Sequence, residues 1–314
     1  MRKFVIDCDT GTNDAIAVCA AFGCEEIEVI GITSVNGNVA GEYAAKNNLD
    51  LVEYLGRTIP VCRGASIPLY SGYVNKSDLT HGKTGLDSVV LPAAKKRKFD
   101  SRIASRFLYE TAVECGGELE LLVTGPMTNI ALAVIQYEAF APLIRHLYFM
   151  GGAVWGGNVS TSAEFNIWAD PEAAHVVLNS GIPLTMVGLD VTLQAIMERE
   201  DVVRLRQSGG SACGFAADLL DFMFTRHEAY GGKDVIMHDA VALAAAVYPE
   251  CLGFERYYID AETTGTYTRG HTFADLRNRT GKPSNVRTAM QIDVPAFRNW
   301  LVSRIICCDD RRPE

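Results

Sequence analysis

Long hydrophobic runs are missing from this chain of 314 residues. No stretch approaches the roughly 18 uninterrupted apolar residues that read as a membrane-spanning helix, so we expect no membrane partner. Met1 to Lys3 are followed by only three apolar residues, Phe4, Val5 and Ile6, before Asp7, too few for the apolar core of a signal peptide. The sequence therefore predicts a soluble, cytoplasmic protein.

Paired cysteines and an excess of positive charge are also missing. The nine cysteines are scattered, odd in number and without a C-x-x-C pair, which indicates reduced thiols. The formal net charge is −9, and an acidic balance argues against a nucleic-acid partner. The basic run at 93–98 is expected to be a solvated face. No proline-rich or low-complexity linker divides the chain, so we expect one domain over residues 1–314.

Short apolar runs alternate with helical patterns along the first two thirds of the chain. The expected strands are Phe4–Cys8, Glu26–Ser34, Leu119–Thr124, His146–Met150 and Pro183–Leu189. The expected helices are Ala15–Phe22, Ala40–Gly56, Ser101–Cys115, Thr128–Tyr137 and Pro171–Asn179. This order predicts an α/β fold, a Rossmann-like open sheet that is mostly parallel and flanked by helices.

The last third of the chain adds further elements to this sheet. The segment from Ile196 to Tyr248 is mainly helical in pattern. β-like segments then follow near Phe254–Asp260, Gly265–Gly270 and Asn285–Asp293, and a last helix is expected near Pro295–Ile305.

Polar side chains follow five of the expected strands. They are Asp7, Asp9, Asn13 and Asp14 at the first, Asn36 and Asn38 after the second, Thr124 to Asn129 after the third, Asn158, Glu164 and Asn166 after the fourth, and Asp190 after the fifth. Ligands of open parallel sheets bind outside the carboxyl ends of the strands, so these residues mark the expected site.

Three carboxylates, Asp7, Asp9 and Asp14, are crowded into eight residues. Crowded carboxylates repel one another unless a shared proton, a basic partner or a metal ion neutralises them. No lysine or arginine lies near Asp9 or Asp14 in the sequence. Oxygen ligands alone select Ca²⁺ or Mg²⁺, and the missing His/Cys ligand pattern argues against zinc.

Eight segments, in this order, resemble the motifs of the inosine–uridine-preferring nucleoside hydrolases. They are DCDTGTND, TSVNGN, HGKTGL, LLVTGPMTNIALA, LYFMGGAV, GNVSTSAEFNIWADPEAA, MVGLDVT and MHDAVA. The resemblance extends over nearly the whole chain, and the AEFN…DPEAA block and the late HDA are its most specific parts.

The resemblance implies an enzyme that hydrolyses the N-glycosidic bond of a nucleoside to a free base and ribose. It implies a Ca²⁺ ion bound by Asp9, Asp14, Asp239 and the backbone carbonyl of Thr124, and a homo-oligomer, either dimer or tetramer. The substrate-binding residues that it implies are Asn13, Asn38, His81, Met150, Asn158, Glu164, Asn166 and Tyr230.

The chemistry of the reaction suggests two catalytic roles. Breaking the bond builds positive charge on the ribose, which nearby carboxylates stabilise. A metal ion acidifies a bound water, and we expect Asp9 to accept its proton. His238 is the expected proton donor to the leaving base, because histidine titrates near neutrality.

The chain departs from the family pattern at several positions. Thr10 replaces a proline, and Asn13 replaces an acid that would accept a hydrogen bond from a ribose hydroxyl. Lys83 replaces an acid, and Arg226 stands where pyrimidine-preferring members often have glutamine. We expect these positions to affect activity or substrate choice.

Two alternatives remain open at this point. DCDTGT resembles a scrambled D-x-D-G-T signature of haloacid-dehalogenase-type phosphatases, which would make Asp7 a nucleophile and the metal Mg²⁺. The other alternative is a calcium-dependent nucleoside-binding protein whose catalysis has weakened through Asn13.

Overall fold

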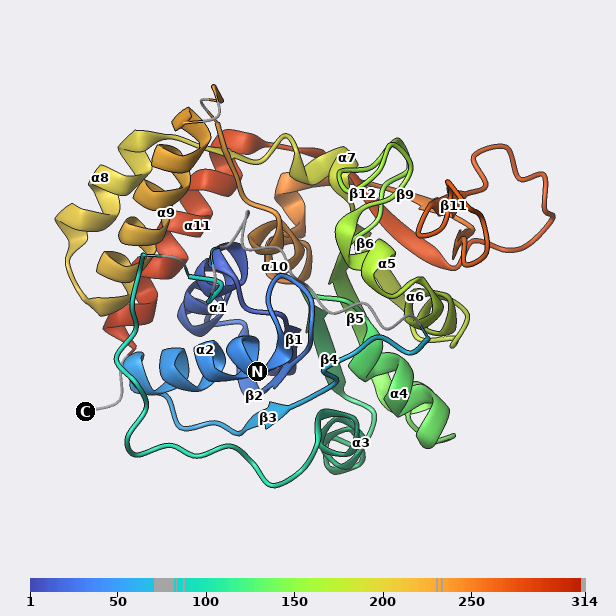
Figure 1. Ribbon diagram of the computed structural model, residues 1–314, viewed down its shortest axis with the longest axis horizontal. Helices are drawn as coiled ribbons and strands as arrows, with labels where there is room; N and C mark the ends of the chain where they lie inside the picture. Colours follow the sequence, from blue (N-terminus) through green and yellow to red (C-terminus); the bar gives the residue numbers. More distant parts are fainter. Residues whose placement is uncertain (71–81, 83, 87, 230, 233, 312–314) are drawn as a thin grey trace.

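An eight-stranded sheet organises the chain. The computed structural model describes residues 1–70, 82, 84–86, 88–229, 231–232 and 234–311. The strands lie in the order β3-β2-β1-β4-β5-β6-β12-β9, and each pair is parallel except the edge strand β9, which is antiparallel to β12. The predicted α/β fold with a mostly parallel central sheet is confirmed (Figure 1).

Strands and helices alternate along the first two thirds of the chain, as expected. The sheet strands are β1 Arg2–Cys8, β2 Ile27–Ser34, β3 Val61–Arg63, β4 Leu119–Val123, β5 Ile144–Met150, β6 Leu184–Val187, β9 Leu252–Tyr257 and β12 Val286–Ile292. Two small antiparallel ribbons pair β7 Ile196–Met197 with β8 Val235–Ile236, and β10 Ile259–Ala261 with β11 Thr272–Ala274. The helices are α1 Thr12–Gly23, α2 Gly41–Tyr54, α3 Ala104–Glu114, α4 Thr128–Gln136, α5 Phe165–Ala169, α6 Pro171–Leu178, α7 Leu189–Thr192, α8 Arg199–Ser208, α9 Ser211–Ala229, α10 Asp239–Val247 and α11 Val294–Asp310, with short 3₁₀ turns at Ala141–Leu143 and Pro249–Cys251.

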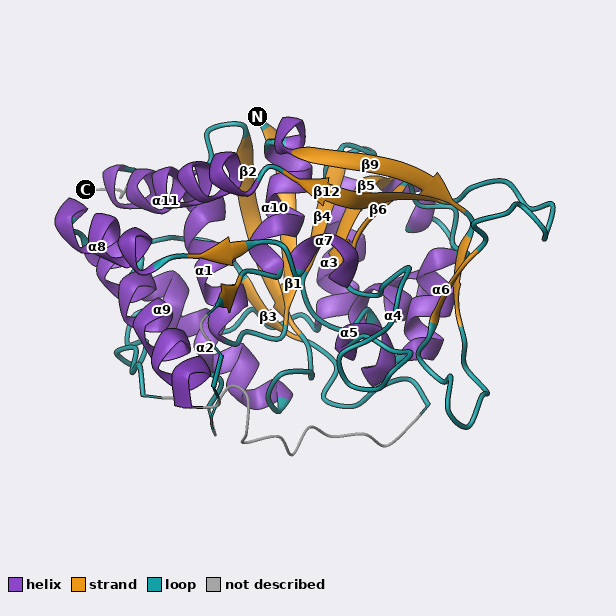
Figure 2. Ribbon diagram, turned by 90° about the horizontal axis from the view of Figure 1, so that it is seen from above, coloured by secondary structure: helices purple, strands orange, loops and turns teal. Residues whose placement is uncertain are grey.

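Each face of the sheet carries its own core. Successive side chains of a strand point to opposite faces, so Phe4 and Ile6 of β1 enter one core while Val5 between them enters the other. Helices α1, α2, α8, α9, α10 and α11 cover the first face, and α3, α4 and α6 cover the second (Figure 2). No described helix is long and apolar enough to cross a bilayer.

Helix α1 is buried along its whole length. All its residues from Thr12 to Gly23 are inaccessible or nearly so, because the sheet, α9, α10 and α11 surround it. Alanine-rich sequence allows this, since small side chains let neighbouring backbones approach closely. At Gly23 the approach is closest, because an added Cβ would lie 1.8 Å from the carbonyl oxygen of Arg304 in α11. The two ends of the chain are therefore packed together.

Several short elements differ from the sequence expectations. The strand β3 and the helices α5 and α7 were not expected. The β-like segment expected at Gly265–Gly270 is wrong, since these residues form turns and the strand β11 follows them. The carboxylate of Glu262 accepts hydrogen bonds from the backbone N–H groups of Thr264 and Gly265, and the N–H of Arg269 donates to the carbonyl of Gly265. These local hydrogen bonds satisfy backbone groups that a strand would have paired with a neighbour.

Candidate functional site

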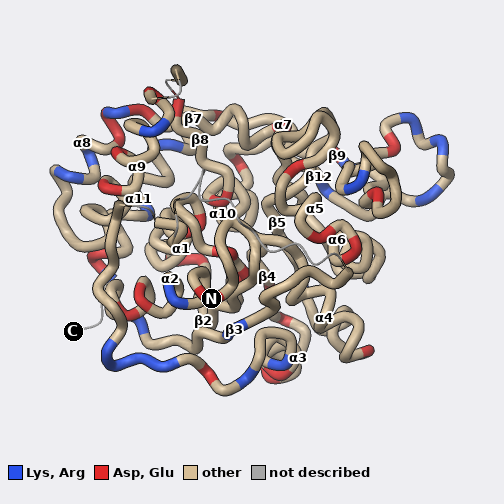
Figure 3. Tube along the Cα trace, viewed as in Figure 1, with Lys and Arg blue, Asp and Glu red and all other residues tan. Residues whose placement is uncertain are grey.

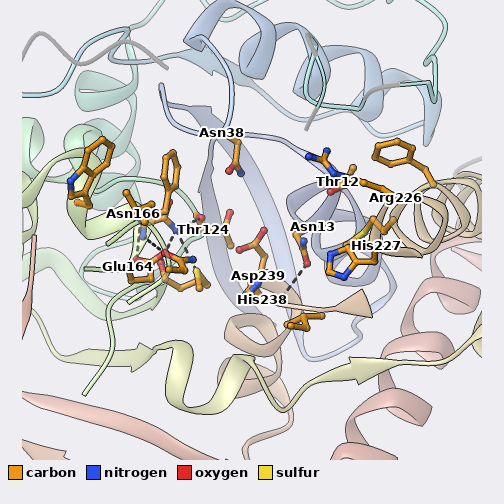
Figure 4. A pocket seen from close by; sticks show the side chains of 18 residues that line it. Thr12, Asn13, Asn38, Thr124, Glu164, Asn166, Arg226, His227, His238 and Asp239 are labelled. Carbon is orange, nitrogen blue, oxygen red and sulfur yellow. Dashed lines mark hydrogen bonds between the residues drawn. The ribbon is translucent and has the colours of Figure 1, made fainter. Parts of the chain in front are cut away.

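The cavity lies where the strand order of the sheet reverses. Chain order runs outward from β1 in both directions, through β2 and β3 on one side and β4 to β6 on the other. The loops after β1, β4 and β5 and the start of α10 meet at this point, as expected for a ligand site in an open sheet. They enclose a cavity of about 530 Å³. Its lining includes most of the described residues that the sequence singled out, namely Asn13, Asn38, Thr124, Met150, Asn158, Glu164, Asn166, His238 and Asp239 (Figure 4).

Three buried carboxylates crowd together beside the cavity, and one of them, Asp239, lines it. Asp9 and Asp14 are fully buried and Asp239 is 4% exposed. Asp14 lies within hydrogen-bonding range of both Asp9 and Asp239. Burial and the charges of the neighbouring carboxylates raise the pKa of Asp9 and of Asp239 well above the ordinary value, and burial raises the pKa of Asp14. Such a cluster is stable only if protons or a cation neutralise it.

Asn38 and Asn13 connect this cluster to the cavity. The side-chain amide of Asn38 donates to Asp9 Oδ1 at 3.1 Å and to Asp14 Oδ2 at 3.2 Å, and its backbone N–H donates to Asp9 Oδ2. Asn13 Oδ1 accepts a hydrogen bond from the backbone N–H of His238 at 3.1 Å. Asn13 therefore ties the first turn of α1 to the start of α10, besides lining the cavity.

Thr124, directly after β4, contacts both Asp14 and Asn166. Its hydroxyl donates to Asp14 Oδ1 at 2.7 Å. Its carbonyl oxygen accepts from Asn166 Nδ2 at 2.8 Å, and the same amide donates to the carbonyl of Met150 at 3.1 Å. A carbonyl oxygen has two lone pairs, so the Thr124 carbonyl keeps one for another partner.

Glu164 caps the short helix α5 and also lines the cavity. Its Oε2 accepts from the backbone N–H groups of Gly152 and Asn166, at 2.8 and 3.0 Å. Burial raises the pKa of Glu164 to about 7. The loop that precedes α5 is held by Asn158, whose Oδ1 accepts from the backbone N–H of Phe165 at 3.0 Å. The hydrogen bonds of both side chains thus fix the positions of backbone next to the cavity.

His238 is buried at the start of α10. Its Nδ1 lies 2.9 Å from the hydroxyl of Thr192. Burial, with a smaller contribution from the charge of His227, lowers the pKa of His238 to about 4. The ring is therefore neutral at pH 7, and the expectation that it titrates near neutrality does not hold. A neutral imidazole still offers one N–H, on the nitrogen that does not accept a hydrogen bond.

The donor atoms at the carboxylate cluster fit a hard cation. Among the residues that the structure describes, no three Asp, Glu, His or Cys side chains are already spaced as metal ligands. Asp14 lies within hydrogen-bonding range of Asp9 and of Asp239. Carboxylates at hydrogen-bonding range share protons, and a cation that replaces those protons would separate them slightly. Every candidate donor is oxygen, from three carboxylates and one carbonyl, which is the ligand type of Ca²⁺ and Mg²⁺.

Comparison with known proteins decides the family. The family model described as inosine-uridine preferring nucleoside hydrolase matches residues 4–299. The chain belongs to this family. It is 35% identical over 297 residues, 94% of each chain, to the pyrimidine-specific ribonucleoside hydrolase RihB of Escherichia coli (strain K12). Among solved structures it resembles a purine-preferring ribonucleoside hydrolase from Gardnerella vaginalis, with a TM-score of 0.91, 33% identity and coverage of 98% of this chain and 99% of that one. It also resembles a plant nucleoside hydrolase, PpNRh1, with a TM-score of 0.89, 30% identity and coverage of 97% and 98%.

As a nucleoside hydrolase, the protein cleaves nucleosides to a free base and ribose. The family is metal-dependent. Membership leaves no support for the phosphatase alternative, and the position of Asp7 also argues against it. Asp7 is fully buried, and its Oδ2 accepts hydrogen bonds from Thr33 Oγ1 and from Asn129 Nδ2. A nucleophile needs access to substrate, which this carboxylate lacks. Asp7 instead joins β1 to β2 and α4.

Several sequence predictions lie away from the cavity or outside the described residues. His81, Lys83 and Tyr230 fall outside the described residues. The basic run at 93–98 follows the surface along α2, where the carboxylate of Glu53 accepts three of its backbone N–H groups (Figure 3). Asp190 holds the backbone of Val154 and Trp155.

The hydrolase cavity also contains residues that sequence reasoning missed or left undecided. His227 and Thr12 line it, and neither was singled out. Arg226 lines it as well, although a helical arginine usually points to solvent. The last turn of α9 brings Arg226 and His227 to the cavity. The orientation of this turn depends on how α8, α9 and α11 pack together, and no local sequence motif predicts that packing.

Proposed function

We propose that this nucleoside hydrolase works with one Ca²⁺ ion held by Asp9, Asp14, Asp239 and the backbone carbonyl of Thr124. The observation that carries the proposal is the set of three buried carboxylates in contact, with no arginine or lysine among their hydrogen-bond partners in the described part of the chain. The chemistry that the ion supplies when bound is the acidification and orientation of a water molecule.

The residues of the chain then have distinct roles. Asp9 accepts the proton of the attacking water, and the carboxylates around it stabilise the positive charge that builds on the ribose. Asn13, Asn38, Asn158, Glu164 and Asn166 hold the ribose hydroxyls, and Met150 packs against the sugar. Because these groups are already fixed by hydrogen bonds to backbone or to one another, little ordering remains to be done on binding.

His238 donates a hydrogen bond to the leaving base. Its bond with Thr192 and the backbone bond with Asn13 orient the ring towards the cavity. Since the ring is neutral at pH 7, it contributes as a hydrogen-bond donor rather than as a charged acid. His81 and Tyr230 are proposed to lie at the base on the family resemblance alone.

We also propose one domain over residues 1–314, a homo-oligomer, and a cytoplasmic location. The support for the location is that all nine cysteines are free thiols, as a reducing compartment would keep them.

The experiment combines metal removal with a matched pair of substitutions. Ribose release from a nucleoside panel is measured before and after chelation, and Ca²⁺ affinity is measured by calorimetry on the stripped protein. Asp14→Asn should lose both Ca²⁺ binding and turnover, while Asp218→Asn, the same change on the exposed surface of α9, should keep both. Full turnover after chelation, or in Asp14→Asn, would contradict the proposal.

A further inference from the structure

Two of the proposed ribose-binding residues lie on one loop, residues 157–164, which precedes α5. Asn158 is near the start of this loop and Glu164 is at its end, and both line the cavity. The carbonyl oxygen of the fully buried Ala163 accepts the backbone N–H of Asn158 at 3.1 Å. An added Cβ at Gly157 would lie 2.3 Å from the backbone nitrogen of Ala163, so the loop is closed tightly on itself. The position of Ala163 therefore sets the positions of both cavity residues.

The connection between β10 and β11 binds this loop from a distant part of the sequence. His271, the residue before β11, pairs with Ala163 in an isolated antiparallel bridge. Its Nδ1 lies 2.9 Å from the carbonyl oxygen of Ser162, 109 residues away in the chain. A carbonyl oxygen only accepts, so Nδ1 carries a hydrogen and donates it. The hydroxyl of Ser162 donates in turn to the carbonyl oxygen of Tyr267 at 2.9 Å, so two consecutive residues of the loop are held by this connection.

The two residues before His271 fix the connection to α5 and α6. Arg269 donates to both carboxylate oxygens of Glu172 in α6, at 2.8 and 2.9 Å, and such a bidentate pair restricts orientation as well as distance. Gly270 has a φ of +83°, and an added Cβ there would lie 2.6 Å from the Cα of Trp168 in α5. Neither Arg269 nor His271 lines the cavity. His271 is therefore held against the loop from outside the site.

Resting on the proposed function, we infer that His271 is a positioning residue for the ribose, and that Arg269 holds it in place. His271 does not touch the substrate. It acts through the backbone of residues 157–164, which it keeps where Asn158 and Glu164 meet the ribose hydroxyls. Hydrogen bonds to sugar hydroxyls strengthen as the glycosidic bond breaks, so a misplaced loop weakens the transition state more than the bound substrate. A misplacement of about 1 Å costs on the order of 100-fold in rate.

Kinetics on substrates that differ by one ribose hydroxyl test this inference. The parameters kcat and KM are measured for a ribonucleoside that the unsubstituted protein hydrolyses and for its 2′-deoxy and 3′-deoxy counterparts. His271→Ala removes the donor to the carbonyl of Ser162, so kcat for the ribonucleoside should fall about 10- to 100-fold, with a smaller change in KM. The deoxynucleoside that lacks the hydroxyl bound by this loop should lose less, because the misplaced groups have nothing to bind there. Ca²⁺ affinity should not change, since the loop provides no proposed metal ligand.

Three further variants complete the experiment. His271→Asn keeps an N–H donor on a δ atom, so it should recover most of the kcat that His271→Ala loses. Arg269→Gln loses the bidentate pair with Glu172 and should show the same kinetic pattern as His271→Ala, at a smaller size. His175→Ala is the matched control, because the Nδ1 of His175 lies 2.7 Å from the carboxylate of Asp260 in β10, away from the loop. It should leave kcat for all three substrates unchanged, and thermal unfolding of each variant checks that the fold is intact.

The outcomes separate this inference from the proposed function. An unchanged kcat in His271→Ala, an equal loss on all three substrates, or a loss that His271→Asn does not recover overturns the positioning role while the unsubstituted protein still releases ribose. If His271→Ala does not fold, Arg269→Gln and the same three substrates decide by the same criteria. Absence of ribose release from every common nucleoside in the unsubstituted protein, with Ca²⁺ present, overturns the proposed function and the inference with it.

Discussion

A methyl group added at Gly37 would collide with the carboxylate of Asp9. An ideal Cβ at Gly37 lies 2.0 Å from Asp9 Oδ2, against about 3.4 Å for ordinary contact, and 2.8 Å from Pro126 Cδ on another side. The backbone at Gly37 is not in the left-handed region, so the cost of Gly37→Ala is steric alone. Because Pro126 prevents the new methyl group from moving away from Asp9, the carboxylate itself has to move by about 1 Å.

The hydrogen bonds of Asp9 set the size of the effect. Both of its oxygens accept from Asn38, and losing one bond to a carboxylate costs about 1.5–3 kcal/mol. A displacement of about 1 Å at a catalytic group costs roughly 100-fold in rate. We therefore expect Gly37→Ala to unfold several degrees lower, to lose most of its Ca²⁺-dependent stabilisation and to release ribose about 100-fold more slowly.

Gly41→Ala is the matched control, because the same added methyl group meets nothing closer than 3.4 Å. Calorimetry with and without Ca²⁺ and a ribose-release assay measure all three quantities in both variants. If Gly37→Ala behaves like Gly41→Ala in Tm, in its response to Ca²⁺ and in rate, the placement of Asp9 in the reaction is wrong.

Three further outcomes are expected. His238→Ala should slow the hydrolysis of nucleosides by up to about 10²-fold, which is the low end for proton donation because the ring is neutral. The same change should hardly affect p-nitrophenyl riboside, and equal losses on both substrates would remove the donor role. Asn13→Asp keeps an acceptor for the backbone N–H of His238 and adds negative charge at the ribose, so kcat/KM for uridine or inosine should rise about tenfold. A lower kcat/KM on every common ribonucleoside, with unchanged Ca²⁺ affinity, would show that Asn13 suits another substrate. Burial lowers the pKa of His146 to about 4, so the stability that depends on its neutral form is complete above pH 6.5 and is lost as the pH falls towards 4. Because His146 is only half-buried, solvent reduces this loss to about 1–2 kcal/mol. Urea unfolding at pH 7 and pH 5 should show a smaller difference in His146→Gln than in the unsubstituted protein, and equal differences would contradict the assignment.

Sequence patterns predicted the elements that local chemistry determines. The mainly apolar run at Leu119–Val123 predicts a buried strand. Asp170 and Pro171 start α6, where the Asp170 carboxylate caps the helix by accepting from the N–H of Ala173. The three residues of β3 are too few for any period, and they are a strand only because β2 lies beside them. The turns at Gly265–Gly270 depend on hydrogen bonds to the side chain of Glu262. The alternation of apolar and polar residues, from which a strand is predicted, contains no information about such bonds.

The same division holds for the site. Asp9, Asp14 and Asn38 follow strand ends, so their meeting could be expected from topology. The bonds from His238 to Thr192 and from its backbone to Asn13 join segments 46 and 225 residues apart, and they exist only after assembly. The neutral state of His238 follows from that assembly and not from its neighbours in sequence.

The packing of α1 against α11 has a consequence for synthesis on the ribosome. Asp14 is made long before α11, on a helix that is apolar on nearly every side. Its last covering element, α11, ends at Asp310. Until that segment emerges, the helix that carries Asp14 has an open side, and a nascent chain that stops short of α11 should be held by chaperones or degraded. Catalytic competence is thus tied to the synthesis of α11, although Asp9 and Asp14 lie far upstream of that helix in the chain.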